Sequence, residues 1–514
     1  MRSVVDSVLV ANRGEIALRV TRACREMGLR SVAVYSDADR WSPHVLAADE
    51  AYRLGPAPAS ESYLAVDRIL EVAEKSRAAA VHPGYGFLAE RAGFARAVED
   101  AGLVFIGPTS TTIAAMGDKT EARRRMRDAG VPVVPGTTEP AKGPDEAARA
   151  AREVGFPVVL KASAGGGGKG MRVVRSEEEV ERAFEGATRE AVQAFGDGAV
   201  YVEKFLANPR HVEIQLLGDA DGRVVHLGER ECSIQRRHQK LIEEAPSPVV
   251  DSELRDAMGQ AAVRAAEAVA YLGAGTVEFL LDGRDFYFLE MNTRIQVEHP
   301  VTELVTGVDL VRWQLRIAGG ETLDFSQNDV QMRGHAVECR ITSEDPSQGF
   351  LPATGEIRGL TVPTGPGVRW DGGISVGMEV GLHYDPLLGK LVAHGPDRPT
   401  TLAVMKRALD ELRIQGVDTC IPFHRRILED EAFRNGEFSI QFLDQRSDLL
   451  AGSHSPNARR AAAVAGALLE EIRRNGAPGE PLESRSHDGA GPGFRRGREL
   501  SPWQRAGWPW ANGG

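Results

Sequence analysis

Two carboxylates and a carboxamide interrupt a pair of apolar runs in the sequence. Glu278 lies within residues 276–281, and Glu290 and Asn292 lie within residues 286–292. Alternation along 286–292 predicts a strand whose even-numbered side chains, two phenylalanines together with Glu290 and Asn292, share one face. An unpaired buried carboxylate is costly, so a cation is expected beside these groups. Because all three are hard oxygen donors, they predict a Mg2+ or Mn2+ site; a solvated loop of mixed charge is the alternative, which the apolar flanks disfavour.

The connection between the two runs determines whether the carboxylates meet. Asp282 and Gly283 are a hairpin signal. A three-residue loop or a bulge would place Glu278 opposite Glu290, whereas a two-residue loop would place them on opposite faces. The residues that follow are too polar for a core strand and predict an anion site beside the metal. They are Arg294, Gln296, Glu298 and His299.

A glycine-rich loop at 165–170 follows a predicted strand at 157–161 that ends in Lys161. The loop matches GxGxxG, but a second strand at 171–174 follows instead of a helix, so the Rossmann geometry fails. The Walker pattern fails as well, because Lys169 precedes glycine and not serine or threonine. A disordered linker is the alternative. The flanking strands and the two lysines favour a flap whose backbone amides close over phosphates.

Several charged residues outside these runs are ambiguous when each is taken alone. Lys119, at a predicted helix start, would ordinarily be a surface residue, and His211 a structural one. Glu203, on a predicted strand at 200–206, suits ribose hydroxyls or the edge of a base. The charged run 229–244 would by itself be a solvated face.

The whole chain limits the class of protein. Its 514 residues, 42% hydrophobic and 26% charged, predict about three globular domains. The formal net charge of −11 argues against nucleic acid as the main partner. No secretory signal and no apolar run of membrane-spanning length is present, so we expect a cytoplasmic protein without a membrane partner. Four scattered cysteines without CxxC spacing are expected to be reduced thiols.

The elements that must position these residues begin with a βα alternation, which predicts a parallel sheet covered by helices. The first turn lacks GxGxxG, so dinucleotide binding is not supported there. A glycine-rich turn at 82–87 is either a tight connection or one wall of a cleft. The expected strands lie at 7–11, 31–36, before His82 and at 103–106, and the expected helices at 15–27, 66–75 and 94–100.

The later elements are a helix, a mixed region and a tail. Ser176 and Glu179 form a capping box that predicts a helix ending near Phe195. From Gly334 onward short strands precede helices around 402–412 and 421–430. In the tail a helix is expected at 457–474, and a disordered segment at 476–514 whose three tryptophans are candidate docking anchors.

Taken in order, the motifs resemble one family. MGDK at 116–119, the glycine flap, YVEK, PRHVEIQ, RRHQK, EMNTRIQVEHPVTE and HAVECRI, with VANRGEIALR near the start, are similar to the biotin carboxylase subunit of acetyl-CoA and related acyl-CoA carboxylases, which are ATP-grasp ligases. The likeness runs from about residue 8 to about 443. Departures are Ala89-Glu90-Arg91 in place of Ser-Glu-Asn, and Lys169 in place of a frequent arginine.

The resemblance implies an α/β (α+β overall) architecture, with an ATP-grasp fold between a Rossmann-like parallel-sheet domain and a mixed α/β domain. The implied domains are 1–115; 116–330, with a mobile glycine-rich lid at about 132–205; 331–446; and a tail at 447–514 that touches a partner. The Tyr384-Asp385-Pro386 loop resembles a family loop near the dimer contact and the biotin site.

The resemblance also implies site residues, carried over by position. The ATP contacts are Lys119, Lys161, Gly167, Gly168, Glu203, Lys204, Phe205, Leu206, His211 and His238. The metal ligands are Glu278, Glu290 and Asn292, as the strand pattern also predicts. The bicarbonate pocket is Lys240, Arg294, Gln296 and Val297; the catalytic residues are Arg294, Glu298 as base, Lys240 and Arg340, which also faces biotin.

The implied activity is Mg2+- or Mn2+-dependent carboxylation of biotin by ATP and bicarbonate, as the first half-reaction of an acetyl-CoA or acyl-CoA carboxylase of fatty acid biosynthesis. Because Met405-Lys406 lies in a helical pattern, no biotin attachment site is evident, and biotin is expected on a separate carboxyl carrier protein. The other expected partners are a second copy of the chain, forming a homodimer, and a carboxyltransferase subunit. The alternatives are an ATP-grasp ligase with another acceptor and a non-catalytic nucleotide-binding subunit.

Overall fold

The computed structural model describes residues 5–137, 139–162, 171–195 and 198–450, and short pieces at 460, 463–468 and 470–471. Residues 1–452 form one compact unit and 453–514 another. Gly167, Gly168 and the three tail tryptophans lie outside the described residues. The described pieces of the tail are helical, as the sequence predicts for 457–474.

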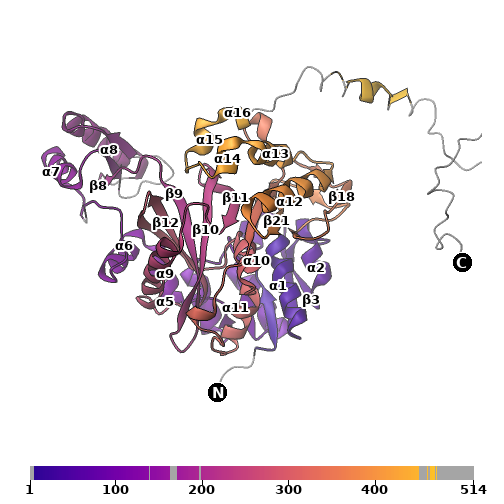
Figure 1. Ribbon diagram of the computed structural model, residues 1–514. Helices are drawn as coiled ribbons and strands as arrows, with labels where there is room; N and C mark the ends of the chain where they lie inside the picture. The colour runs from indigo at the N-terminus through magenta and orange to yellow at the C-terminus, as the bar shows by residue number, and fades with distance from the viewer. Residues whose placement is uncertain are drawn as a thin grey trace, which may run out of the picture. The chain divides into compact units, whose positions relative to one another are not determined.

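The first hundred residues form the expected parallel sheet, in the order β3-β2-β1-β4-β5. Apolar side chains of the strands pack against apolar side chains of the covering helices. Figure 1 draws this region in indigo and violet. The strands are β1 (Ser7–Val10), β2 (Arg30–Ser36), β3 (Glu50–Gly55), β4 (Ala80–His82) and β5 (Val104–Phe105), and the helices are α1 (Gly14–Glu26), α2 (Pro43–Ala47), α3 (Val66–Ser76) and α4 (Ala92–Asp100).

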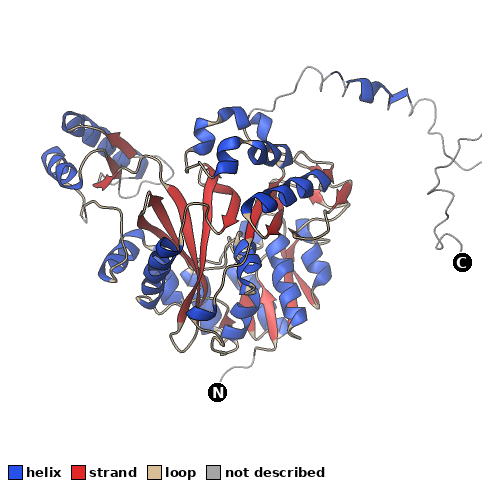
Figure 2. Cartoon of the chain, viewed as in Figure 1, coloured by secondary structure: helices blue, strands red, loops and turns tan. Residues whose placement is uncertain are grey.

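An eight-stranded antiparallel sheet follows, in the order β13-β12-β9-β10-β11-β14-β21-β19, and Figure 2 shows its strands in red. It runs without a break from the central third of the chain into the carboxy-terminal third, because β11 pairs directly with β14. The strands are β9 (Arg210–Gly218), β10 (Val224–Arg236), β11 (Gln239–Ala245), β12 (Gly273–Asp282), β13 (Asp285–Asn292), β14 (His335–Thr342), β19 (Val368–Gly372) and β21 (Leu387–Gly395).

The two faces of this sheet differ in character. One face is mainly apolar and packs against α9 (Ser252–Glu267), α12 (Arg398–Glu411) and α13 (Ile421–Glu429). It also holds two buried carboxylates, Glu229 and Glu244, which pair with arginines of α9 and α12. On the other face, α10 (His299–Thr306) packs against β10, β11, β14 and β21. Most of the buried charged side chains of the sheet lie on this second face. The helix α10 and the loop before it therefore cover a polar layer.

A three-stranded sheet, β7-β6-β8, flanks the glycine loop and stands out from the central strands with α7 and α8 (Figure 1). The expected capping box is wrong: Ser176 makes no side-chain capping bond, and a 3-10 turn precedes the helix. Glu179 accepts instead from the backbone N–H of Arg175 at 2.8 Å. The elements are α7 (Pro144–Val154), β6 (Val158–Ala162), β7 (Met171–Val174), α8 (Val180–Phe195) and β8 (Val200–Lys204).

The remaining elements connect these layers. They are α5 (Ser110–Gly117), α6 (Lys119–Asp128), α11 (Leu310–Ala318), α14 (Glu431–Asn435), α15 (Phe442–Gln445), α16 (Ser447–Leu450), β15 (Glu344–Asp345), β16 (Leu351–Pro352), β17 (Gly355–Glu356), β18 (Gly359–Thr361), β20 (Glu379–Val380) and β22 (Arg413–Gln415). Among the described helices, none is both long and apolar enough to span a bilayer. The four cysteines are free, as expected, and all four are buried.

Candidate active site

A β-bulge brings the predicted metal ligands together. The β12–β13 hairpin turns at two residues, yet Glu278 pairs with Glu290, because the register shifts between Glu278 and Phe279. Phe288 pairs with Phe279, so Leu289 is the extra residue on β13. Of the connections that the sequence leaves open, the structure has a two-residue turn combined with a bulge, and the bulge places the two carboxylates opposite each other.

The same bulge corrects the predicted strand face. Glu290 and Asn292 do not share a face with Phe286 and Phe288, because one inserted residue reverses the alternation beyond it. Met291 packs in the core with Phe288, while Glu290 is exposed and Asn292 is buried on the polar face. Only Glu278 of the two paired carboxylates is buried.

A second bulge turns Lys240 toward this polar face. Gln235 pairs with Lys240 and Ile234 with Ile242, so Leu241 is an extra residue on β11. Leu241 and Ile242 both join the apolar core, and Lys240 points the opposite way, toward three carboxylates. The turn before it holds Arg237 and His238 at positive φ, a conformation that costs non-glycine residues about 1 kcal/mol or more.

Lys240 is the centre of the charged cluster. Its Nζ lies 2.5 Å from Glu213 Oε2, 2.9 Å from Glu278 Oε1 and 2.7 Å from Glu298 Oε1. Burial alone would lower the pKa of Lys240, but the three carboxylates together raise it well above its ordinary value. The site therefore contains a permanent cation.

Glu298 is held between two cations. It is 2% exposed, and Arg340 Nη2 donates to its Oε2 at 2.8 Å while Lys240 contacts its other oxygen. Burial raises the pKa of Glu298, but Lys240, Arg340 and Arg230 outweigh it and hold that pKa well below its usual range. Glu298 is thus ionised and able to accept a proton once the cations are drawn away.

Arg230 is fully buried and connects several polar side chains of this cluster through hydrogen bonds. Its Nε donates to Glu213 at 2.6 Å and one Nη2 bond reaches Gln296 Oε1 at 2.6 Å. Because the guanidinium only donates, Gln296 must present its oxygen to Arg230 and its NH2 to Glu278 Oε1, at 2.8 Å. The other Arg230 acceptors are Gln215, Thr276 and Thr302.

Arg340 lies on β14 and joins the cluster because β14 continues the same sheet. Besides Glu298 it bonds Glu243 Oε1 through Nε at 2.5 Å. Burial raises the pKa of Glu243 to about 7, with Arg340 opposing and Glu298 reinforcing the shift. On the backbone side, the Arg340 carbonyl accepts from His424 Nε2 at 2.7 Å.

Arg294 lies at the metal-ligand end of the site. Its Nε donates to Glu90 at 2.9 Å and its Nη2 to Asn292 Oδ1 at 3.0 Å. Asn292 in turn donates to Glu278 Oε1 at 2.8 Å, so a chain of bonds connects Arg294 to the Lys240 cluster. Glu90, Glu290 and Asn292 line one pocket with the residues just before α6, where Lys119 begins the helix.

The predicted nucleotide residues are divided between two sheets: His211 is on β9 of the eight-stranded sheet, whereas Lys161 and Glu203 are on β6 and β8 of the three-stranded sheet. His211 Nε2 is 3.0 Å from Glu278 Oε2, and both are buried. Lys161 Nζ is 3.9 Å from Glu203 Oε2, and Glu203 pairs with Arg123. On β8, Lys204 donates to the Gly155 carbonyl, and Phe205 and Leu206 follow this strand. His238 is exposed in the turn between β10 and β11.

The oxygen-only set of Glu278, Glu290 and Asn292, facing one way, fits a hard divalent cation. Within the described residues, His211 and Glu213 also place ligand atoms within 4.8 Å of Glu278. Glu213, however, is already bonded to Arg230 and Lys240.

The residues that sequence reasoning missed are Glu213, Arg230, Glu243 and Glu90. Glu213 is in PRHVEIQ on β9, and Arg230 is in EREC on β10, where the two residues pair directly across the strands. In the sequence, Arg230 is hidden within the charged run 229–244. Glu243 is identifiable only by its contact with Arg340 across the sheet, and Glu90 only by its contact with Arg294.

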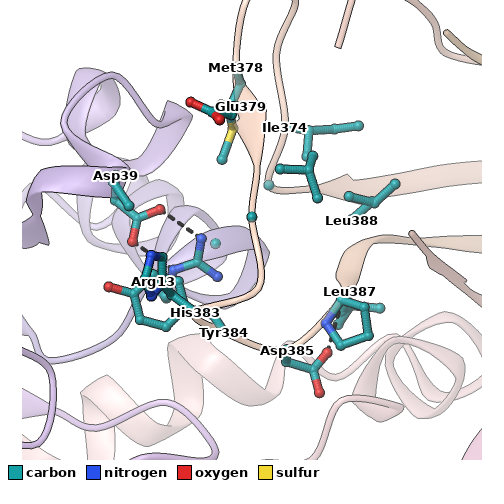
Figure 3. A pocket seen from close by; sticks show the side chains of 16 residues that line it. Arg13, Asp39, Ile374, Met378, Glu379, His383, Tyr384, Asp385, Leu387 and Leu388 are labelled. Atoms are coloured by element: carbon teal, nitrogen blue, oxygen red, sulfur yellow. Dashed lines mark hydrogen bonds and ion pairs between the residues drawn. The ribbon is translucent and has the colours of Figure 1, made fainter. Parts of the chain in front are cut away.

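The Tyr384 loop closes a separate pocket, shown in Figure 3. Arg13 bonds both oxygens of Asp39, at 2.7 and 2.6 Å, and stacks 4.2 Å from the centre of the Tyr384 ring. Tyr384 also bonds Ser36 at 2.6 Å. The loop is thereby attached to the parallel sheet.

Three family models match successive parts of the chain. They are the biotin carboxylase N-terminal domain at 4–113, the ATP-binding domain of the carbamoyl-phosphate synthase L chain at 118–326, and the biotin carboxylase C-terminal domain at 338–445. Together they follow the parallel sheet, the central strands and the carboxy-terminal strands.

Curated relatives agree with these models. A pyruvate carboxylase component of Methanothermobacter thermautotrophicus is 56% identical over 440 residues, covering 86% of this chain and 90% of the relative. Biotin carboxylase of Nostoc sp. is 53% identical over 441 residues, covering 86% of this chain and 99% of the relative.

Solved structures agree as well. The biotin carboxylase domain dimer of Hydrogenobacter thermophilus 2-oxoglutarate carboxylase, in complex with MgADP, ADP and bicarbonate, has a TM-score of 0.80 and 48% identity, covering 88% of this chain and 100% of that one. The mixed α/β architecture expected from the sequence is confirmed. The chain belongs to the biotin carboxylase family.

Proposed function

We propose that this protein carboxylates biotin, using ATP and bicarbonate, with the biotin carried on a separate carboxyl carrier protein. The observation that carries the proposal is Glu298, a buried carboxylate held at 2.7 Å by Lys240 and at 2.8 Å by Arg340. A base flanked by two fixed cations suits an anionic substrate whose proton must be removed. The relatives named biotin carboxylase, and a neighbour bound to MgADP and bicarbonate, support the same reaction.

We assign the site residues as follows. Lys240, Arg294, Gln296 and Val297 bind bicarbonate, and Arg340 faces the biotin ureido group. ATP is bound by Lys119, Lys161, the flap residues Gly167 and Gly168, Glu203, Lys204, Phe205, Leu206, His211 and His238. Glu278, Glu290 and Asn292 would hold Mg2+ or Mn2+, which when bound spreads the negative charge of the phosphoryl groups.

The reaction begins when bicarbonate enters between Glu298 and its cations. Lys240 then contacts the substrate anion instead of Glu298, and the pKa of Glu298 rises toward the working pH. Glu298 takes the bicarbonate proton, and the freed oxygen attacks the γ-phosphorus of ATP with loss of ADP. Arg294 and Lys240 hold the resulting carboxyphosphate as fixed donors.

The second step transfers the carboxyl group. Carboxyphosphate breaks its C–O bond to phosphate, releasing CO2 and trianionic phosphate, which takes the proton from the ureido nitrogen of biotin. The nitrogen then bonds to CO2. Arg340 stabilises the negative charge on the ureido oxygen, as a preorganised donor of the oxyanion-hole type.

The proposal also includes a lid, a homodimer and a partner subunit. The glycine-rich lid at about 132–205 closes over ATP, the protein acts as a homodimer, and the carboxylated carrier passes to a carboxyltransferase subunit. Relatives carry the names of pyruvate, 2-oxoglutarate and methylcrotonoyl-CoA carboxylases. We therefore propose that the carboxylation of biotin is the same for each of these acceptors, and that the carboxyltransferase selects the final acceptor.

The test is ATP hydrolysis with Mg2+, measured with and without bicarbonate and free biotin. We expect hydrolysis to require bicarbonate and to rise with biotin, and Glu298→Gln to lose it while still binding ATP. Asp37→Asn, at an exposed carboxylate that pairs with Arg53 and not with the cluster, is the matched control. Hydrolysis that ignores both substrates, or that survives in Glu298→Gln, would contradict the proposal.

A further inference from the structure

Lys390 is a fully buried lysine near the middle of β21. A lysine is almost never fully buried without a specific partner. Its Nζ has two partners: it donates to the backbone carbonyl of Val297 at 2.8 Å and lies 3.1 Å from Glu15 Oε1. The carbonyl belongs to the residue immediately before Glu298.

The two partners come from parts of the chain far apart in sequence. Glu15 lies in the first turn of α1, and its Oε1 also accepts from the hydroxyl of Tyr85, in the turn after β4. Val297 belongs to the loop between β13 and α10. One ammonium group on β21 therefore joins the parallel-sheet region, the loop that carries Glu298, and the carboxy-terminal strands.

The strand register places Lys390 beside the reacting groups. It pairs directly with Arg340 across β14 and β21, so both side chains project to the same face of the sheet. Arg340 bonds Glu298 from one strand, and Lys390 holds the preceding carbonyl from the next. The separation between the Glu298 carboxylate and the Arg340 guanidinium thus depends on both contacts.

We propose that Lys390 is a positioning residue for the reaction: by holding the Val297 carbonyl it sets where Glu298 lies relative to Lys240 and Arg340. The proposal rests on the proposed function of Glu298 as the base. Lys390 acts through the backbone and touches no substrate. Small displacements of a catalytic group, on the order of 1 Å, can cost about 100-fold in rate.

Replacing Lys390 alone would leave Glu15 buried without its cation, which would confuse folding with positioning. The test variant is therefore Lys390→Met/Glu15→Gln, which removes both charges. Its matched control is Glu15→Gln, which removes the ion pair but keeps the Lys390–Val297 bond and leaves Lys390 with Asp371, its cross-strand neighbour on β19, as an anionic neighbour. Lys390→Gln/Glu15→Gln is a second double variant, which keeps a polar side chain at position 390 that is too short to retain the 2.8 Å contact with Val297.

Thermal unfolding, the KM for ATP and the kcat of bicarbonate- and biotin-dependent hydrolysis are measured for each. We expect both double variants to keep the ATP KM of the control and to lose about 10-fold or more in kcat. The kcat–pH profile should also shift on its acid side in the double variants only, because Glu298 leaves its cations. A purely structural lysine would lower the unfolding temperature and move neither quantity.

A folded double variant with the kcat and pH profile of Glu15→Gln overturns the role of Lys390 and leaves the proposed function intact. If neither double variant folds while Glu15→Gln does, Lys390 is a folding residue and the positioning role is rejected. A wild-type protein without bicarbonate-dependent turnover instead contradicts the proposed function, and this inference with it.

Discussion

Replacing Arg230 by methionine tests whether the polar layer is organised by one buried cation. Arg230 and Glu213 are both fully buried and bonded at 2.6 Å. Removing one partner of a buried ion pair typically costs about 3–5 kcal/mol. Lys240 still contacts the other oxygen of Glu213, so the lower end of that range applies to the pair.

The lost amide contacts add to this cost. Gln296 and Gln215 each lose a donor, at about 1 kcal/mol apiece. The expected total is about 4–5 kcal/mol, a large part of the roughly 5–15 kcal/mol that stabilises a folded protein. Adding Glu213→Gln should recover about 2 kcal/mol, because the double variant has no unpaired buried charge.

Native-state hydrogen exchange of the β9 and β10 amides is the appropriate measurement, because it reports local opening without assuming two-state unfolding of a long chain. We expect exchange in Arg230→Met to accelerate by far more than 10-fold. Arg53→Met is the control, since Arg53 bonds Asp37 with similar geometry but half exposed, and no change is expected.

Acceleration of less than about 5-fold in Arg230→Met, equivalent to about 1 kcal/mol, would refute the reasoning. So would an equal loss in Arg230→Met and in the double variant with Glu213→Gln, because the charge of Glu213 would then be of no consequence.

Three further predictions concern other parts of the molecule. Arg340→Ala should lose about 10²–10³ in biotin-dependent turnover and should also lower the unfolding temperature, because the buried carboxylate of Glu243 loses its cation. Full activity in steady-state assays would exclude its role. Glu290→Gln should raise the Mg2+ concentration needed for half-maximal hydrolysis; an unchanged requirement would remove it from the ligand set. Burial lowers the pKa of His44 to about 4 from 6.5, so folding keeps it neutral and stability is lost as pH falls from 6.5 toward 4, by at most about 3 kcal/mol. His44→Phe should flatten the unfolding temperature against pH in that window, and an unaltered slope would disprove this.

The sequence alone was sufficient for the order and type of most elements. The alternation before Asp100 led directly to the parallel sheet, because strand and helix periods are local properties of the chain. The motifs around Lys240, Arg294 and Glu298 located the candidate site, since so dense a set of charges in apolar strands is difficult to explain without a ligand. The absent Ser176 cap shows where local signals fail, because the Glu179 N–H donates to the Ser176 carbonyl in a 3-10 turn and not to the Ser176 hydroxyl.

Only the tertiary structure decided which faces the charged residues occupy and which strands meet. An inserted Leu289 or Leu241 reverses the alternation beyond it, and no local pattern distinguishes a bulge from a regular strand. Likewise, Arg340 reaches Glu298 because β11 pairs with β14 across about ninety residues of chain. Such pairing depends on the packing of the whole sheet, so contacts such as Lys390 with Val297 have no signature in the sequence near either residue.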